Sequence, residues 1–119
     1  MIYHITSRSA WNEARERGEY WAESLETEGF IHCSTRSQVL PVLRKFYKGQ
    51  TGLLLLVIEP TLLSADLQWE PPSGGTPPPG IPEGDLFPHI YGPINLDAIQ
   101  RAVDLETNPN GDYELPSDL

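Results

Sequence analysis

The stretch Leu53-Leu54-Leu55-Leu56-Val57-Ile58 decides the fold, because it holds six apolar residues in a row and no polar position. A strand with one face in water alternates apolar and polar residues, so an unbroken apolar run is typical of a strand covered on both faces. We therefore expect residues 53–58 to form the central strand of a sheet. The run is far shorter than the ~20 residues that a membrane-spanning helix needs, so no membrane span is expected.

The N-terminus of the chain predicts a strand followed by a helix. Residues 2–6 alternate aliphatic and polar side chains, which places His4 and Thr6 on the same face of the strand. A helix is predicted after this strand as far as about Arg17, because Gly18 is a typical residue for a helix end.

A second strand that carries histidine is predicted over residues 30–35. Its period of two puts His32 and Ser34 on one face. The spacing of Thr35 and Gln38 matches a capping box, in which each residue satisfies a backbone group of the other at the start of a helix. We therefore expect this strand to lead directly into a helix.

A proline- and glycine-rich segment separates the middle of the chain from its last third. Residues 71–85 contain little apolar matter and are predicted to form a long surface loop or flap. Residues 87–92 predict a strand with His89 and Tyr91 on one face. Because Pro88 lacks a backbone N–H, it would confine this strand to a sheet edge or would lie at the start of the strand.

The C-terminal residues predict a helix and then a hairpin. Asn95 can cap a short helix over residues 96–101, and residues 102–106 and 113–115 flank a turn at 108–111. Taken in order, the elements indicate an α+β, or mixed α/β, fold that forms a single domain over residues 1–119. They lack the regular alternation of a doubly wound nucleotide-binding fold.

Composition narrows the classes of function and location. The net charge is −9, and residues 59–119 hold only Arg101 against eleven acidic residues. Extended nucleic acids require many Lys and Arg contacts to phosphate, so a long nucleic acid is not an expected partner. The single cysteine, Cys33, cannot form an internal disulfide, and no signal segment is recognisable, so we expect a cytoplasmic protein.

The three histidines, His4, His32 and His89, are the main functional clue, because each lies in a predicted strand beside polar or aromatic residues. An imidazole can donate from one ring nitrogen and accept at the other, so it can bind a ribose hydroxyl or act as acid or base. Half-buried histidines satisfied by backbone groups are the alternative interpretation. No pair has the spacing of a metal site, so no metal is expected.

Four motifs resemble one bacterial family, catalogued as domain of unknown function 952. They are Ile2-Tyr3-His4-Ile5, Gly29-Phe30-Ile31-His32-Cys33-Ser34-Thr35, Leu67-Gln68-Trp69-Glu70 and Phe87-Pro88-His89-Ile90-Tyr91-Gly92-Pro93, and they extend over nearly the whole chain. The family is thought to be similar in fold to the ADP-ribosyltransferases and the tRNA 2′-phosphotransferases. The resemblance implies two small, facing, mostly antiparallel sheets with short helices, which hold NAD in a cleft.

The resemblance also implies roles for individual residues. His4 would contact a ribose, His32 would lie near the nicotinamide, and His89 would take the late position where these enzymes often have glutamate. Because a histidine cannot replace a carboxylate beside an oxocarbenium-like centre, Glu70 is the candidate for that charge. The residues expected to bind the ligand around this catalytic set are Thr6, Arg8, Ser34, Thr35, Arg36 and Tyr91, with the two arginines paired to phosphate and the tyrosine stacked on a ring.

Two hypotheses of function follow. The first is an ADP-ribosyltransferase-like enzyme that binds or transforms NAD or another ADP-ribose-type nucleotide ligand in a histidine-lined cleft. The second is a binding module for a small ligand or a protein, which keeps the cleft without catalysis. We expect the three imidazoles to converge on one concave surface, and residues 71–85 to close over it as a flap.

Overall fold

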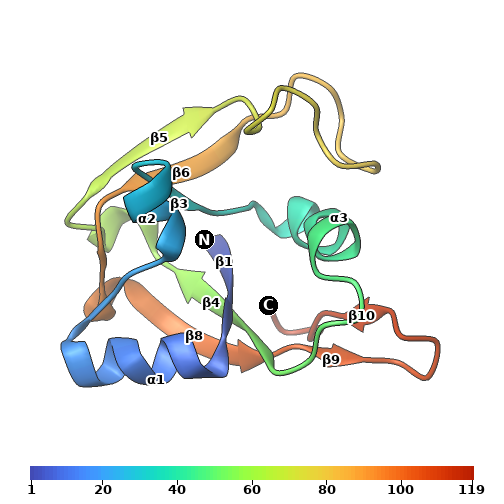
Figure 1. Ribbon diagram of the computed structural model, residues 1–119, viewed down its shortest axis with the longest axis horizontal. Helices are drawn as coiled ribbons and strands as arrows, with labels where there is room; N and C mark the ends of the chain where they lie inside the picture. Colours follow the sequence, from blue (N-terminus) through green and yellow to red (C-terminus); the bar gives the residue numbers. More distant parts are fainter.

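Two antiparallel sheets of three strands each form the framework of the computed structural model, which describes residues 1–119 (Figure 1). One sheet has the order β1-β4-β8, with β1 at Ile2–Ser7, β4 at Leu53–Ile58 and β8 at Ile99–Asp104. The other has the order β3-β6-β5, with β3 at Ile31–His32, β6 at Phe87–Tyr91 and β5 at Asp66–Glu70. The predicted α+β fold with antiparallel sheets is confirmed.

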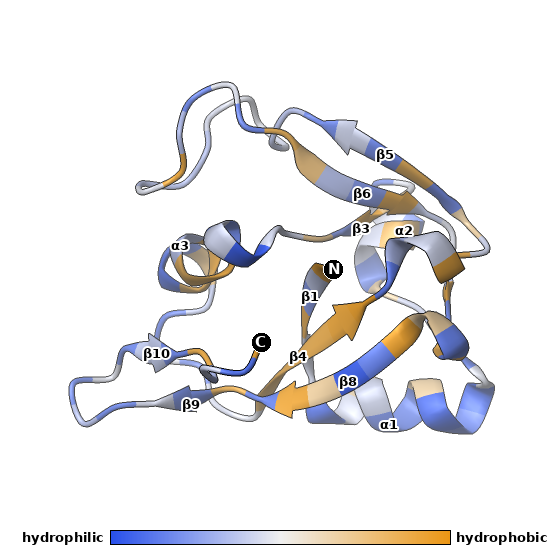
Figure 2. Ribbon diagram, turned by 180° about the vertical axis from the view of Figure 1, so that it is seen from behind, coloured by the Kyte–Doolittle hydropathy of each residue, from blue (hydrophilic) through white to orange (hydrophobic).

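The apolar run 53–58 is the central strand of the first sheet, as predicted, and all six of its side chains are buried. Leu56 packs into a core shared with the second sheet, whereas Leu55 packs into another core against the longest helix. Figure 2 shows β4 hydrophobic along its length, in contrast to the mixed colours of β8 at the sheet edge. The absence of a polar face in the sequence thus reflects two separate cores.

Two of the predicted helices are confirmed, and residues at their ends cap both of them. Helix α1 (Arg8–Arg17) begins at Ser7, whose side chain accepts from the Ala10 N–H, and ends at Gly18, which has φ 94°. Helix α3 (Arg36–Phe46) has the predicted capping box, and the Thr35 N–H donates to Gln38 Oε1 at 2.9 Å. Helix α3 also contains Pro41 in its interior.

A short helix and three smaller elements lie in the connections between the strands of the two sheets. They are α2 (Glu23–Thr27), β2 (Glu19–Tyr20), which pairs with β7 (Ile94–Asn95), and the 3-10 helix η1 (Pro60–Leu62). The sequence patterns predicted neither α2 nor β5. None of the helices has both the length and the apolar composition required to cross a bilayer.

The second sheet decides between the two positions predicted for Pro88, because the proline lies near the start of its strand, and that strand is not at a sheet edge. Strand β6 lies at the centre of its sheet, so it is not an edge strand. Proline is nevertheless accommodated at the second position, because β3 is only two residues long and pairs with His89 and Ile90 of β6 but not with Pro88. The Pro88 carbonyl still accepts a hydrogen bond from the Cys33 N–H at 3.0 Å.

The predicted helix over residues 96–101 is wrong. A 3-10 turn, η2 (Leu96–Ala98), is followed at once by β8, which supplies the second partner of β4. The Asn95 side chain does not cap a helix; it accepts from the Ser64 N–H and donates to the Leu62 carbonyl. Long-range pairing with the buried central strand therefore overrides the local helix signal.

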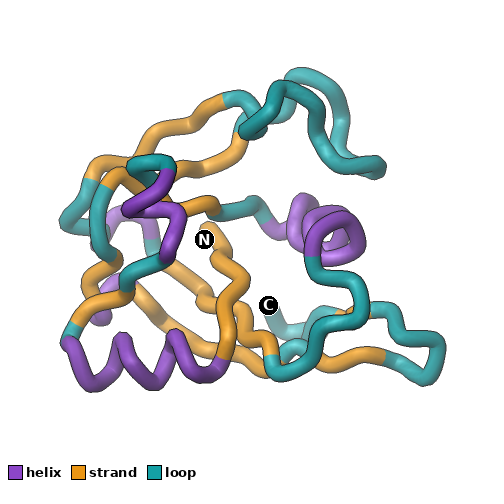
Figure 3. Tube along the Cα trace, viewed as in Figure 1, coloured by secondary structure: helices purple, strands orange, loops and turns teal.

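The C-terminal hairpin and its turn are confirmed, but its first arm is shorter than the predicted 102–106, because residues 102–104 belong to β8 and pair with β4. Strand β9 (Glu106–Thr107) pairs antiparallel with β10 (Tyr113–Glu114), and Asn108 Oδ1 accepts from two N–H groups of the turn between them. The 71–85 segment contains no helix or strand, as predicted. In Figure 3 it is the long loop that leaves the ends of β5 and β6 and extends towards α3.

Candidate functional site

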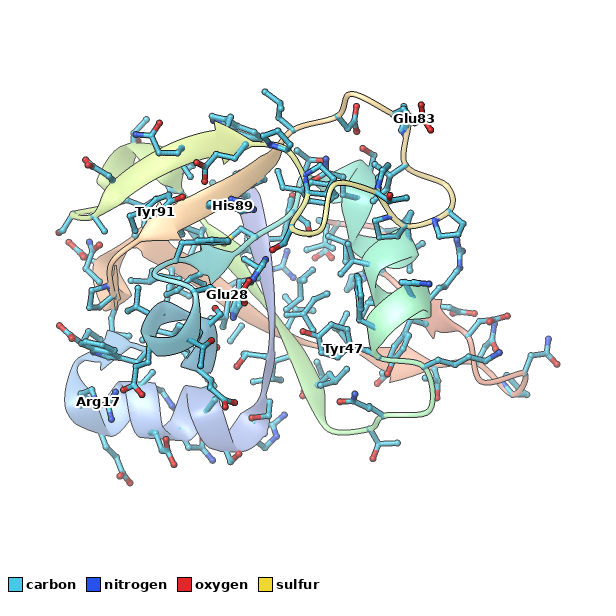
Figure 4. All side chains as sticks on the ribbon, turned by 45° about the horizontal axis from the view of Figure 1, so that its top comes forward. Arg17, Glu28, Tyr47, Glu83, His89 and Tyr91 are labelled. Atoms are coloured by element: carbon cyan, nitrogen blue, oxygen red, sulfur yellow. The ribbon has the colours of Figure 1, made fainter.

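A cavity of about 640 Å³ lies between α3 on one side and β1, α2 and β3 on the other. We call it the main cavity. Ten of its 20 lining residues are hydrophobic, and five are aromatic: Tyr20, Trp21, Phe46, Tyr47 and Phe87. Figure 4 shows Glu28, which follows α2, and Tyr47, which follows α3, on opposite sides of this space. Its volume falls in the range typical of small-molecule sites.

His4 borders the main cavity, but its ring is held by the protein itself. Nδ1 lies 2.5 Å from the carbonyl oxygen of His32, so this nitrogen carries the proton and donates it. Nε2 then accepts from the Tyr20 hydroxyl at 2.8 Å, and that hydroxyl accepts from Thr6 Oγ1 at 2.8 Å. Burial lowers the pKa of His4 to about 4, so the ring is neutral at pH 7.

The bond from His4 to His32 joins the two sheets. It crosses from β1 to β3 beside the backbone bridge between Tyr3 and Ser34, whose two hydrogen bonds measure 2.9 and 2.8 Å. The His4 imidazole thus links the two sheets as well as lining the cavity, and its other ring nitrogen is bound by the buried Tyr20 hydroxyl. Burial also raises the pKa of Tyr20 to about 12, so this phenol stays protonated.

His32 and Glu28 form the accessible acid–base pair of the main cavity. His32 Nε2 donates to Glu28 Oε2 at 2.9 Å, and both side chains are about 40% exposed, at 41% and 40%. The hydrogen bond from His32 holds the pKa of the Glu28 carboxyl below its ordinary value. The second carboxylate oxygen, Oε1, accepts from the Ser73 hydroxyl at 3.2 Å.

His89, Glu70 and Tyr91 form a second cluster that does not line the main cavity. Glu70 Oε1 accepts from His89 Nδ1 at 2.8 Å and from the Tyr91 hydroxyl at 2.5 Å, and these bonds lower the pKa of Glu70. The His89 side chain is only 4% exposed and is stacked on Phe30, with ring centroids 4.2 Å apart. Figure 4 shows His89 and Tyr91 together on β6.

We expected the three imidazoles to converge on one concave surface, but only two of them line the main cavity. His4 and His32 border it, whereas His89 pairs in register with His32 and lies behind it, with a ring-centroid distance of 5.5 Å. Ser34 also borders the cavity, and Cys33 is a buried core residue that touches it. Burial raises the pKa of the Cys33 thiol well above its ordinary value.

The arginines expected to bind phosphate lie elsewhere. Arg8 forms an exposed ion pair with Asp104 of β8, and Arg36 is an exposed residue of the first turn of α3. Thr35 is engaged in the capping box, and neither it nor Thr6 lines the cavity. Of the predicted binding residues, Ser34 alone lies in the cavity wall.

The structure adds residues that the sequence patterns did not single out. Tyr20, Trp21, Glu28 and Tyr47 all line the main cavity, and none belongs to a recognisable motif. Glu28 precedes His32 by four residues, but that spacing signals a pair only within a helix, and the chain here runs from α2 into β3. Sequence alone therefore gave no reason to pair them.

The charges around the cavity are unevenly arranged. Its lining contains Glu23 and Glu28 but no lysine or arginine. The Arg17 guanidinium lies over the ring of Trp21, which is one of the lining residues, 5.8 Å from its centroid. No group of three or more histidine, cysteine or acidic side chains is arranged to hold a metal ion. The lining is thus acidic and aromatic, and one cation contacts one of its aromatic residues.

These features define a small α+β protein with a ligand-sized cavity next to the line where its two sheets meet. A model of a family described as protein of unknown function, DUF952, matches residues 5–102, and the chain belongs to that family. The crystal structure of protein CC0527 from Caulobacter crescentus is similar, with 33% identity, 96% of this chain and 93% of that chain covered, and a TM-score of 0.79.

The solution NMR structure of CC0527 agrees with this likeness. It has 33% identity, covers 99% of this chain and 95% of that chain, and gives a TM-score of 0.78. None of the curated proteins matches the chain.

Proposed function

We propose that the main cavity binds a nucleotide-type ligand of the NAD class, and that the Glu28–His32 pair is the group that acts on it. The observation that carries this proposal is the imidazole–carboxylate pair facing aromatic side chains across a cavity of about 640 Å³. Aromatic side chains bind flat heterocycles, and an imidazole or a carboxylate binds ribose hydroxyls. The proposal therefore follows from the kinds of group present and from the family resemblance.

The charge arrangement favours one orientation of such a ligand. The nicotinamide ring of NAD is a cation, which suits an interior with two carboxylates and aromatic faces. A pyrophosphate placed there would lose its water with no cation to pair with it. We therefore place the nicotinamide riboside end inside the cavity, and the pyrophosphate towards Trp21, the lining residue that Arg17 contacts.

The same placement gives Glu28 the charge-stabilising role for which Glu70 was the candidate. Transfer of an ADP-ribosyl group breaks the bond from nicotinamide to ribose through an oxocarbenium-like centre, which a nearby carboxylate stabilises. Glu70 is bonded to His89 and Tyr91 away from the cavity, whereas Glu28 lies in its wall. The proposed catalytic pair is therefore Glu28 and His32, with His4 holding the His32 backbone.

A specific observation also supports the second candidate, a binding module without turnover. Both ring nitrogens of His4 are occupied, and the neutral ring is no proton donor to a ligand. His89 and Glu70 are bonded to each other outside the cavity. Only one of the three histidines is then free to exchange protons with a ligand, which is a minimal set for catalysis.

Calorimetry with NAD, nicotinamide riboside and ADP-ribose tests the proposal. We expect saturable binding of NAD and of nicotinamide riboside, and weaker binding of ADP-ribose, which lacks the cationic ring. Glu28→Gln should weaken the binding of both cationic ligands by about tenfold, since it removes one partner of a charged contact. Glu26→Gln is the matched control, because Glu26 is an exposed residue of α2, two positions before Glu28, and does not line the cavity.

The orientation has its own control pair. Arg17→Ala should weaken the binding of NAD and leave the binding of nicotinamide riboside unchanged. Arg15→Ala, which removes an equivalent contact with Trp11, should change the binding of neither ligand. Release of free nicotinamide, measured by chromatography, would separate the transferase from the binding module. The absence of heat with all three ligands would overturn the proposal, and tightest binding of ADP-ribose would overturn the orientation.

A further inference from the structure

The 71–85 segment forms part of the wall of the main cavity. Four of its residues, Pro72, Ser73, Thr76 and Pro78, line the cavity together with the side chains of α3 and β3. The segment begins directly after Glu70 of β5 and leads into β6, so both its ends are fixed in the second sheet. Figure 1 shows it passing from that sheet towards α3.

The later half of the segment is firmly attached to α3. Pro78 and Ile81 are buried, and Gly80 lies beside Pro41, so that an added Cβ would be in van der Waals contact with the proline ring at 3.4 Å. At the end of the segment the Gln38 side chain donates to the Leu86 carbonyl at 3.0 Å. This half therefore moves with the helix.

The earlier half, residues 72–76, has far fewer attachments. Its backbone makes a turn in which the Gly75 N–H donates to the Pro72 carbonyl, and no backbone hydrogen bond links it to a sheet or helix. Its side-chain hydrogen bond to the rest of the protein runs from the Ser73 hydroxyl to Glu28 Oε1, at 3.2 Å. Gly74 and Gly75 both have positive φ, which makes this the more pliable half.

We propose that residues 72–76 are a lid over the main cavity, that the Ser73–Glu28 hydrogen bond keeps this lid closed in the absence of ligand, and that a bound ligand takes the place of Ser73 on Glu28. The same carboxylate receives His32 on one oxygen and Ser73 on the other, so a ligand hydroxyl or cation that binds Oε1 displaces the serine. Ser73 is then a specificity residue, since it competes with the ligand for Glu28. Access to the cavity is controlled in this way whatever ligand occupies it.

The single cysteine of the chain reports on the lid without any ligand. Cys33 is 3% exposed and borders the main cavity, so a small uncharged thiol reagent reaches it through the cavity. The rate of modification by N-ethylmaleimide then measures how often the lid opens. Because burial raises the pKa of this thiol, the variants are compared at one fixed pH.

The decisive comparison is Ser73→Ala against Ser117→Ala, an exposed serine near the C-terminus for which the structure gives no hydrogen bond. Ser73→Ala should speed the modification of Cys33 by about fivefold, the factor for a hydrogen bond of about 1 kcal/mol. Ser117→Ala should leave the rate unchanged. Urea midpoints equal to that of the natural protein in both variants would ensure that modification does not report global unfolding.

A second variant tests the lid without relying on Ser73→Ala alone. Glu28→Ala should raise the rate as much as Ser73→Ala, and the double variant should raise it no further, because both changes break the same bond. Equal rates for Ser73→Ala and Ser117→Ala would overturn the lid, as would additive effects in the double variant. The assay contains no nucleotide, so failure of NAD to bind would leave this inference intact.

Discussion

Replacing Leu55 with alanine is expected to lower the free energy of unfolding by about 3 kcal/mol, the middle of the range for a buried leucine. Leu55 has no exposed surface and sits at the centre of β4, where it packs with Val39 and Leu43 of α3. The substitution removes apolar contacts and leaves a cavity that the two neighbouring strands cannot close. Urea unfolding, followed by tryptophan fluorescence, measures the effect.

Leu62→Ala is the matched control for this prediction, because it makes the same chemical change at a side chain that is 48% exposed. Its cost should be below about 1 kcal/mol. Leu56→Ala, on the opposite face of the same strand and in the other core, should cost as much as Leu55→Ala, because both leucines have no exposed surface. A Leu55→Ala variant as stable as Leu62→Ala would contradict the central position of β4.

Acidification from pH 6.5 towards pH 4 is expected to remove up to about 3 kcal/mol of stability through His4 alone. The pKa of His4 is lowered from 6.5 to about 4 by burial, so between these values the unfolded chain binds a proton that the folded protein does not. The unfolded state is therefore favoured as the pH falls through this window. Above pH 6.5 the ring is neutral in both states, and the contribution is constant.

His4→Gln isolates this effect, because the variant lacks the titrating ring. It should be less stable than the natural protein at pH 7, and the difference should shrink as the pH approaches 4. Thr6→Val is the control, because it breaks the hydrogen bond to Tyr20 in the same network without removing a titrating group. Its loss of stability should therefore be similar at every pH. A pH-independent deficit for His4→Gln would show that His4 titrates alike in both states.

The parts of the fold that were predictable are those in which local sequence and long-range packing agree. The run 53–58 has no polar face, and the structure buries both its faces. The Thr35 and Gln38 pair forms the capping box that its spacing indicates, and Gly18 ends α1. Each of these features needs only neighbours in the chain to be recognised.

The parts that were missed depend on partners distant in the sequence. Residues 99–101 belong to strand β8 instead of the end of the predicted helix, and residues 102–104 pair with β4 instead of with the predicted hairpin partner, because β4 is paired on both sides. Strand β5 has a single partly buried apolar residue, Leu67, on its inner side, so its pattern is weak, and its hydrogen bonds come from β6. Pro88 fits a central strand only because β3 is so short.

The candidate site was predictable to a similar degree. The faces assigned to His4, His32 and Ser34 follow from strand periodicity, and all three border the main cavity. Glu28 and Tyr20 reach the cavity through a short helix and a two-residue strand that carry no motif. The partner of Arg8, Asp104, lies in residues 102–106, which were predicted to pair within the C-terminal hairpin and instead belong largely to β8 beside β4, so the ion pair was not predictable.

The order of strands in the first sheet also governs how the chain folds. Ile2 pairs with Ile58, and Leu55 pairs with Val103, so each neighbouring pair closes a loop of about half the chain. Such distant contacts slow folding to milliseconds or longer, because the entropy of each loop is lost before the contact is gained. During synthesis the first strand leaves the ribosome without a partner, and its sheet closes only when the last third of the chain has emerged.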